Sequence, residues 1–388
     1  MKTVFISLCI FLALVSVSIP AEAQTPAEWL IMVYMDGDRP VSDTCYFSLE
    51  EPGITDINEM EMGISESVTV VVQFDRGLCD TSNDGWDTTR RYLIAPDRTE
   101  ETGDYKKIDS KLIEDIGEAN MGDPETLIDF AMWASSSFPA RRKALILWNH
   151  GSGWIDSYPQ ENPTPIKSIC VDNYDELTME ELDYAMSTIT SQYPIDLLGF
   201  DACLMQMIEV AYELKDYAPV IVGSEEIEQS TGWSYDIVLQ EAGYAYAPED
   251  LARIIVESYV GTSTSTLSAI RTSELPYVVE SLNRFCDGIM SENMDVSLNS
   301  TYYFQHFDEE GNSDYADLYS FAEAMQGMEL MEAIESCVIA ENHGSRANAH
   351  GISIWMPTME SGYLNGYGDL KFSYDSLWDE FIAYHLGM

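Results

Sequence analysis

Residues 195–205 read IDLLGFDACLM, an apolar run that ends in an acid, a small residue and a cysteine. A short, uninterrupted apolar run is typical of a strand that is buried on both faces of a parallel sheet. Apolar residues then recur at helical spacing: Leu204, Met207, Ile208, Ala211 and Leu214. The stretch therefore predicts a strand followed by a helix, with Cys203 at the junction.

The same arrangement recurs at residues 144–154, ALILWNHGSGW, where an apolar run ends at His150 and Gly151. The imidazole is then expected at the carboxyl edge of a sheet, where such sheets bind ligands, and the glycine lets another backbone approach. If the two strands are neighbours, Cys203 and His150 come together. A helix N-terminus and a nearby histidine both lower a thiol pKa, so Cys203 is predicted to be a nucleophile.

The rest of the chain alternates between strand and helix patterns. Together with the two strands above, which are included here, the predicted strands are Trp29–Met35, Val68–Phe74, Lys143–Trp148, Ile195–Phe200, Val220–Gly223, Thr264–Arg271 and Gly351–Trp355. Amphipathic segments are predicted at Ile54–Met62, Pro124–Ser136, Leu177–Thr188, Met205–Asp216, Pro248–Tyr259, Glu274–Met290 and Tyr315–Cys337. This alternation predicts an α/β fold with a mainly parallel sheet covered by helices on both faces. The chain shows no internal repeat and no long linker, so residues 24–388 are expected to form one domain.

The N-terminus predicts export. Lys2 precedes an apolar run over Val4–Ile19, and residues 20–23 read PAEA, so residues 1–23 are interpreted as a signal peptide. The apolar run is short for a membrane span, so we expect a secreted mature chain from about Gln24 with no stable membrane insertion.

The composition is strongly acidic, with 67 Asp and Glu against 19 Lys and Arg and a net charge of −48. Such a field repels nucleic acid, so no nucleic-acid partner is expected. The acids are scattered and match no EF-hand loop, so solvated helix faces are the stronger explanation and the acidity alone identifies no site. Six cysteines lie after the leader and form no CxxC motif. Cys286 is predicted in the core, and Cys45 and Cys79 form a hypothetical pair.

Structural interpretations of the two strand ends remain open. A single cysteine is often only a small core residue, and a single histidine is often a structural hydrogen-bonding group. A zinc site is disfavoured, because neither stretch offers a second ligand at metal-binding spacing.

HGSGW at 150–154 followed by GFDACLM at 199–205 resembles the clostripain family of cysteine peptidases, which shares its fold with caspases, gingipains and legumain. Four further stretches are similar to that family, in the same order: WLIMVYMDGD at 29–38, VGSEEIEQSTGWSYD at 222–236, YADLYSF at 315–321 and GISIWMP at 351–357. The resemblance spans nearly the whole mature chain. It implies a caspase-like three-layer α/β/α sandwich around a mainly parallel sheet.

The resemblance implies a secreted cysteine endopeptidase that acts on peptides or proteins. Cys203 would attack the scissile carbonyl to form a thioester, and His150 would serve as general acid and then general base. The backbone N–H groups of Gly151 and Cys203 would bind the oxyanion. The chemistry needs no metal and no cofactor, and no obligate protein partner is evident.

In this family the position of Asp201 lines the pocket for Arg or Lys at P1, where a carboxylate pairs with a cation. The competing interpretation is that Asp201 caps the following helix. Family members with a strict basic preference have a second acid downstream. Here the matching position falls near Thr231, with three displaced candidates, namely Glu225, Glu226 and Glu228.

Calcium binding and activation by cleavage are two further expectations from the resemblance. The acid-rich surface suits calcium, although the sequence names no ligand set. Lys167 is the one basic residue between Gly151 and Ala202, in a proline-rich stretch, and self-cleavage after it would activate a precursor. An ordinary surface loop is the alternative there. A catalytically silent binding protein, and an amidase or transpeptidase on the same fold, are the alternative functions.

Overall fold

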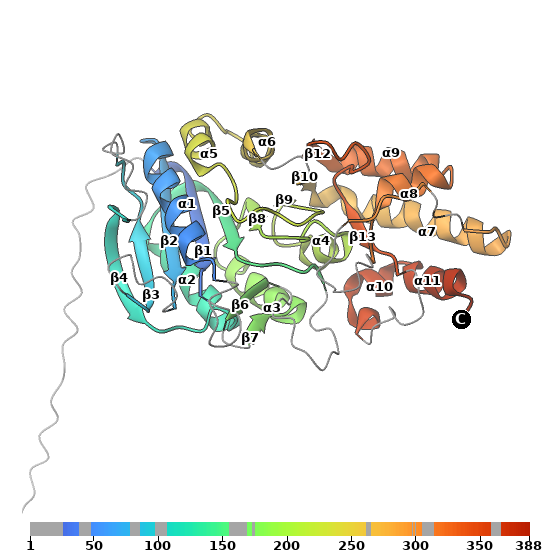
Figure 1. Cartoon of the computed structure of the whole chain (residues 1–388), viewed down its shortest axis with the longest axis horizontal. Coiled ribbons are helices and arrows are strands. Elements are labelled where there is room, and N and C mark those ends of the chain that lie inside the picture. Colours follow the sequence, from blue (N-terminus) through green and yellow to red (C-terminus); the bar gives the residue numbers. More distant parts are fainter. Residues whose placement is uncertain are drawn as a thin grey trace, which may run out of the picture.

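A nine-stranded sheet forms the centre of the molecule (Figure 1). The computed structural model describes residues 26–38, 48–77, 86–97, 107–154, 169–172, 175–260, 265–296, 298, 300–304, 314–357 and 366–388. The strand order is β12-β10-β9-β8-β5-β1-β2-β3-β4. The predicted leader at residues 1–23 lies outside the described residues.

Five neighbouring strands in the middle of this sheet run parallel. They are β2 (Val68–Asp75), β1 (Ala27–Asp36), β5 (Ala140–Trp148), β8 (Leu197–Asp201) and β9 (Val220–Gly223). Their buried apolar residues explain why the sequence revealed all five, since a strand covered on both faces contains few polar residues. The prediction of a mainly parallel sheet is confirmed.

Antiparallel strands extend the sheet on both sides. β3 (Thr89–Leu93) and β4 (Lys111–Gly117) follow β2, while β10 (Leu267–Arg271) and β12 (Val338–Asn342) follow β9. Only β10 was predicted. β4 contains no buried residue and β12 only one, so neither has the continuous apolar pattern that identified the central strands.

Helices cover both faces of the sheet, which gives three layers (Figure 1). Along β1, Leu30, Met32 and Tyr34 face one core, while Ile31 and Val33 face the other. The second core is closed by α1 (Glu50–Gly63), α5 (Tyr235–Ala242) and α6 (Pro248–Ser258). The first is closed by α2 (Pro124–Ser137), α3 (Met179–Thr190), α4 (Ile208–Leu214), α7 (Leu275–Ser291), α8 (Leu318–Ala324), α9 (Met328–Cys337), α10 (Lys371–Asp375) and α11 (Trp378–Leu386).

Two sequence predictions of secondary structure are wrong. The helix predicted from Met205 begins only at Ile208, because Leu204 has a φ of 63° and the N–H of Gln206 bonds to the carbonyl of Ser224, 2.9 Å away. The segment 315–337 contains a strand and two helices, since Gln326 has a φ of 62° and Gly327 separates α8 from α9. The strand predicted at 351–355 is present, but it does not join the central sheet with which the sequence grouped it.

That last segment instead pairs outside the main sheet. β13 (Ser353–Trp355) forms a two-stranded antiparallel sheet with β11 (Tyr315–Asp317). A second small sheet joins β6 (Ile169–Asp172) to β7 (Asp175–Leu177).

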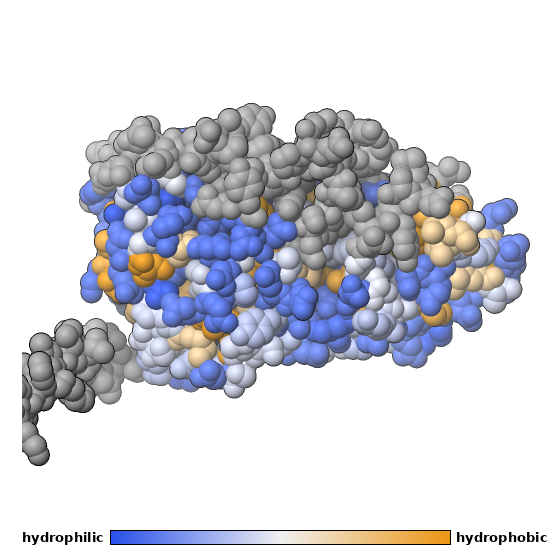
Figure 2. Space-filling model, turned by 90° about the horizontal axis from the view of Figure 1, so that it is seen from below, coloured by the Kyte–Doolittle hydropathy of each residue, from blue (hydrophilic) through white to orange (hydrophobic). Residues whose placement is uncertain are grey.

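The surface, the helices and the cysteines were each the subject of a sequence prediction. On the coloured part of the face in Figure 2 most residues are hydrophilic, and the hydrophobic ones form small separate patches. Among the described residues, none of the helices has the length and apolar character needed to cross a membrane. Cys170, Cys203, Cys286 and Cys337 are free and buried, which confirms the core position predicted for Cys286. The hypothetical Cys45–Cys79 pair lies outside the described residues.

Candidate active site

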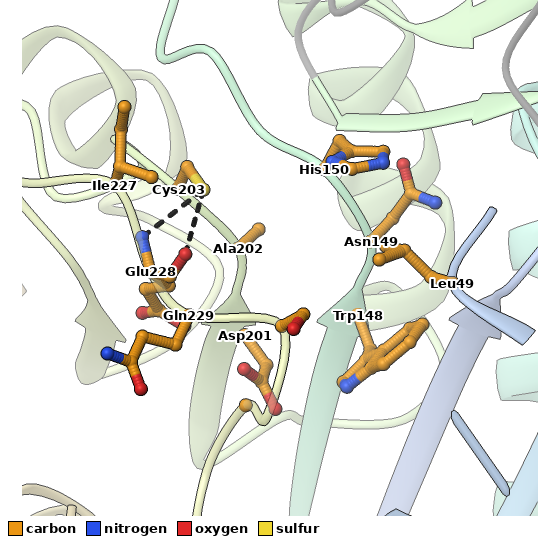
Figure 3. Close-up of a pocket in the computed structure, with 12 residues that line it drawn as sticks. Leu49, Trp148, Asn149, His150, Asp201, Ala202, Cys203, Ile227, Glu228 and Gln229 are labelled. Carbon is orange, nitrogen blue, oxygen red and sulfur yellow. Dashed lines mark hydrogen bonds between the residues drawn. The ribbon is translucent and has the colours of Figure 1, made fainter. Parts of the chain in front are cut away.

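Cys203 and His150 line one pocket at the carboxyl edge of the sheet (Figure 3). β5 and β8 are adjacent and parallel, with Trp148 opposite Asp201, so the residues after both strands emerge at the same edge. The pocket has a volume of about 210 Å³. Figure 3 shows Trp148 and Asp201 side by side beneath His150 and Cys203. The two predicted catalytic residues are therefore on neighbouring strand ends, as their sequence settings required.

Gly151 lets the two strand ends approach each other. A Cβ atom at this position would lie 2.4 Å from the carbonyl oxygen of Cys203 and 3.1 Å from the Cβ of Ala202. Any side chain here would push the backbone of Cys203 away from that of His150. The glycine after the histidine thus has the role that the sequence predicted, close approach of a second backbone.

The Cys203 thiol is buried against the backbone of Glu228. The N–H of Glu228 donates to Sγ at 3.2 Å, and Sγ lies 3.8 Å from the Glu228 carbonyl oxygen. Burial, and then the charge of the Glu228 carboxylate, raise the pKa of the Cys203 thiol to about 12. The expectation of a lowered pKa is wrong, because α4 begins five positions after Cys203 and the neighbouring loop is acidic.

Asp201 forms the floor of the pocket. Its Oδ2 accepts hydrogen bonds from the Trp233 N–H at 3.2 Å and from the Tyr235 hydroxyl at 2.8 Å. Burial raises the pKa of Asp201 to about 6, although these donors favour the ionised form. Asp201 does not cap a helix, because α4 starts at Ile208 and the bonds of this carboxylate go to the segment before α5.

Glu228 is the second acid of this pocket. Burial, followed by the charge of Asp201, raises the pKa of Glu228 well above its usual range. The other two candidates have different partners. Glu225 accepts from the N–H of Gly351 at 2.9 Å, and Glu226 forms an ion pair with Arg346 at 3.0 Å.

A third acid approaches from the helix layer. Asp56 of α1 accepts from Trp148 Nε1 at 2.7 Å, and a Cβ at Gly232 would lie 2.9 Å from Asp56 Oδ2 and 3.0 Å from Asp201 Oδ2. Burial and the charge of Asp201 raise the pKa of Asp56 well above its usual value. The sequence analysis missed Asp56, because no local pattern links a helix acid to a pocket formed by distant strand ends.

Asn149, next to His150, was also missed. Its Nδ2 donates to the carbonyl of Asp36 at 2.7 Å, and its Oδ1 accepts from the N–H of Val171 at 3.1 Å. The side chain therefore links the end of β1 to β6 directly beneath the histidine. Asparagine at a strand end was the available signal, since a buried amide requires partners on both its oxygen and its nitrogen. Lys167, the predicted processing position, lies outside the described residues.

The chain matches known proteins over most of its length. The profile of the clostripain family matches residues 33–385. Clostripain from Hathewaya histolytica is 30% identical over 226 residues, a match that spans 53% of this chain and 40% of that protein.

Two solved structures have a similar fold. One is a secreted C11 cysteine protease from Bacteroides thetaiotaomicron in complex with an irreversible peptide inhibitor, with a TM-score of 0.69, 19% identity and coverage of 91% of this chain and 100% of that one. The other is an inactive zymogen C11 protease from Parabacteroides distasonis, with a TM-score of 0.67, 18% identity and coverage of 91% and 99%. Their similarity confirms the predicted caspase-like α/β/α fold, and the profile match over residues 33–385 decides the family. The chain belongs to the clostripain family.

Proposed function

We propose that this protein is a secreted cysteine endopeptidase in which Cys203 and His150 form the catalytic dyad. The observation that carries the proposal is the position of both side chains in one pocket, at the carboxyl ends of the adjacent parallel strands β5 and β8. A thiol and an imidazole are the nucleophile and the acid/base that acyl transfer needs. Membership of the clostripain family supports the same chemistry.

In this mechanism the Cys203 thiol gives its proton to His150 and its sulfur attacks the scissile carbonyl carbon. The C–N bond then breaks, and His150 gives this proton to the departing amine. The acyl group remains bound to Cys203 as a thioester. Water, deprotonated by His150, attacks the thioester carbonyl, and the proton passes back to the Cys203 sulfur as it leaves. The thiol proton ends on the leaving amine and a proton from water restores the thiol, so the chemistry consumes only water and needs no cofactor.

The backbone N–H groups of Gly151 and Cys203 are our candidates for the oxyanion hole. The close approach of the Gly151 α-carbon to the Cys203 carbonyl supports this assignment, because it brings the two backbone segments to one side of the nucleophile. Backbone donors fixed in this way stabilise the tetrahedral oxyanion without reorganising during the reaction.

We assign Asp201 and Glu228 to the recognition of Arg or Lys at P1. Both carboxylates line the pocket that contains Cys203, and neither has a Lys or Arg among the leading charges that shift its pKa. A guanidinium or ammonium group in the pocket would offset the mutual repulsion of these acids. It would also reduce the negative charge that disfavours the Cys203 thiolate.

Self-cleavage after Lys167 is the proposed activation step. The chain leaves the described structure after Trp154 and returns at Ile169, and Gly151 forms a β-bridge with Ile169. Gly151 and Ile169, described residues on either side of the Lys167 stretch, are therefore neighbours next to His150. The Cys203 thiol is buried, which supports a precursor that needs an activation step.

The deciding experiment is hydrolysis of a fluorogenic peptide library with every residue at P1, using the mature protein and its Cys203→Ala variant. We expect cleavage after Arg and Lys that requires Cys203. A library left uncut by the wild-type protein, with an iodoacetamide probe that fails to label Cys203, would favour a silent binding protein. Hydrolysis that persists in Cys203→Ala would refute the assignment of the nucleophile.

A further inference from the structure

The loop after β9, residues 224–232, is bonded to Cys203 and to the residue that follows it (Figure 3). The N–H of Leu204 donates a hydrogen bond to the carbonyl of Glu226 at 3.2 Å. Further along the loop, the N–H of Glu228 donates to the Cys203 sulfur. The position of Glu226 therefore helps to set where the backbone next to Cys203 lies.

Glu226 is a buried acid that is held from several sides. The residue is 1% exposed, and its N–H contacts the hydroxyl oxygens of Ser224 and Thr266 at 3.1 Å each. Its carboxylate accepts from the N–H of Ile227 at 2.9 Å and forms an ion pair with Arg346 at 3.0 Å. A buried carboxylate is costly unless donors and a cation offset its charge, so the ion pair favours an acid at this position.

Arg346 comes from a distant part of the chain, the turn between β12 and β13. Its N–H donates to the carbonyl of His343 at 2.7 Å, and its own carbonyl accepts from the N–H of Ala349 at 2.9 Å. The guanidinium lies 5.6 Å from the centre of the Tyr302 ring and donates to the Tyr302 hydroxyl. With 17% of its side chain exposed, Arg346 is fixed between this ring and Glu226.

The same turn contacts the loop at a second point. The N–H of Gly351 donates to the carboxylate of Glu225 at 2.9 Å, and the carbonyl of Gly351 accepts from the Ser268 hydroxyl at 2.7 Å. Two successive acids of the loop therefore have partners on one turn. Both contacts lie only two or three positions before Glu228, which touches the Cys203 sulfur.

The charge of Glu226 also acts on the Cys203 sulfur. Burial and then the charge of Glu228 raise the pKa of the thiol, and the charge of Glu226 adds to that rise. The guanidinium of Arg346 carries the opposite charge 3.0 Å from Glu226, so it offsets part of this effect. Loss of Arg346 would leave Glu226 without this cation and would favour the neutral thiol further.

We propose that Arg346 is a positioning residue for the reaction at Cys203, an inference that rests on the proposed function. Through Glu226 it holds the loop after β9 against Cys203 and offsets a negative charge near the sulfur. Arg346 is not among the described residues that line the pocket, so its effect passes through Glu226 and not through contact with a substrate.

The effect on the sulfur is tested by alkylation of Cys203 with iodoacetamide at pH 8, in the mature chain, by mass spectrometry of the peptide that carries Cys203. Arg346→Gln should slow alkylation about threefold or more, because only the thiolate reacts. Arg346→Lys keeps the charge and should react at nearly the wild-type rate. A rate in Arg346→Gln that equals or exceeds the wild-type rate would overturn the proposal.

A double variant tests whether Arg346 acts through Glu226. Glu226→Gln removes the charge that Arg346 offsets, so adding it to Arg346→Gln should restore alkylation to about the wild-type rate or above. Two substitutions that merely damage the loop would slow alkylation further when combined. That result would overturn the proposal.

The effect on catalysis is measured as hydrolysis of the best library peptide. Arg346→Gln should lower kcat/KM about tenfold or more, because the loop beside Cys203 shifts, and Arg346→Lys should retain most of the wild-type value. Arg90→Gln is the matched control. It removes an ion pair with Asp115 at 2.9 Å and a cation–π contact with Trp86 at 4.3 Å, on β3, which lies three strands away from β5.

The control should leave both the alkylation rate and kcat/KM unchanged. An equal fall in Arg90→Gln would show a general loss of stability and would overturn the role of Arg346. If the chain hydrolyses no peptide while alkylation follows the Arg346 variants, the action of Arg346 on the thiol stands and the proposed function fails. If Arg346→Gln hydrolyses peptides as fast as the wild type, the proposed function stands and the role of Arg346 fails.

Discussion

The backbone N–H of Glu228 donates a hydrogen bond to the sulfur of Cys203 across 3.2 Å. This bond places the loop after β9 directly against Cys203, and the Glu228 side chain lines the same pocket. A hydrogen bond to sulfur favours the thiolate, but burial and the Glu228 charge outweigh it and keep the pKa of the thiol at about 12. Burial and this charge therefore favour the neutral thiol of Cys203 over the thiolate.

The dyad predicts that Cys203→Ala and His150→Ala each lower kcat/KM by at least about 10³-fold. The two residues act as one unit, so the double variant should be no slower than either single variant. Steady-state hydrolysis of the best library peptide measures this, with circular dichroism as the check on folding. If the loss of kcat/KM in the double variant equals the product of the two single losses, the two side chains act independently.

The pocket predicts that Asp201→Asn and Glu228→Gln both reduce cleavage after Arg. Loss of one partner of a buried charge pair costs about 2–5 kcal/mol, which is a factor of about 30 or more in kcat/KM. Cleavage after a neutral P1 residue serves as the internal control and should change little. Glu241→Gln, an exposed acid at the end of α5, is the matched surface variant and should keep the preference for Arg.

Buried acids predict that stability falls as the pH rises. The folded protein holds the Asp201 proton up to a pKa of about 6, against an ordinary value of 3.8, so between these values it binds more protons than the unfolded chain. Raising the pH through this window therefore costs folding free energy. Burial raises the pKa of Glu209 to about 7, which extends the window upwards.

The melting temperature, measured in chelator, should thus be higher at pH 5 than at pH 8. Asp201→Asn should reduce the fall of the melting temperature in the lower part of this pH range, and Glu209→Gln should reduce it in the upper part. A melting temperature that rises steadily from pH 5 to pH 8 would contradict the prediction that Asp201 and Glu209 are buried without a compensating cation.

The close contact at Gly151 predicts that adding a single methyl group there greatly lowers the rate of peptide hydrolysis. Gly151→Ala places a Cβ 2.4 Å from the Cys203 carbonyl oxygen, so one backbone has to move. A displacement of about 1 Å at a catalytic group costs on the order of 100-fold in rate. Gly288→Ala in α7 is the control, because a Cβ there meets nothing within 4 Å, and it should stabilise the helix by about 0.5–1 kcal/mol.

Activation predicts one cut after Lys167. Intact-mass analysis of the wild-type protein should show two fragments, and Cys203→Ala and Lys167→Ala should each remain whole. Cleavage that persists in Cys203→Ala would show that another peptidase makes the cut. A fully active wild-type chain of undivided mass would show that activity needs no cut.

The sequence revealed the fold where burial determines the residue pattern. β1, β5 and β8 are covered on both faces, so their apolar runs identify them and also place His150 and Cys203 at the sheet edge. β3 and β4 could not be recognised, because their polar side chains at the sheet margin follow no continuous apolar pattern.

The site was predictable only as far as it lies next to these strands. Asp201 could be identified because it ends β8, and the structure supports its position in the pocket over a helix cap. Glu228 could be named only as one of three acids, since the fold of the loop decides which of them faces Cys203. The expected environment of the Cys203 thiol was wrong. Leu204 has a left-handed backbone conformation, so the helix that was expected to lower the pKa of Cys203 begins only at Ile208.

The pairing of β5 with β8 bears on what a cut between them would produce. His150 would belong to a piece that carries β1 to β5, and Cys203 to a piece that carries β6 onwards, with Ala144–Trp148 against Leu197–Asp201 as a seam of backbone hydrogen bonds. The two pieces would form a heterodimer with no covalent link between nucleophile and base. Recovery from denaturant would then become bimolecular and depend on protein concentration, and separately produced pieces should complement each other.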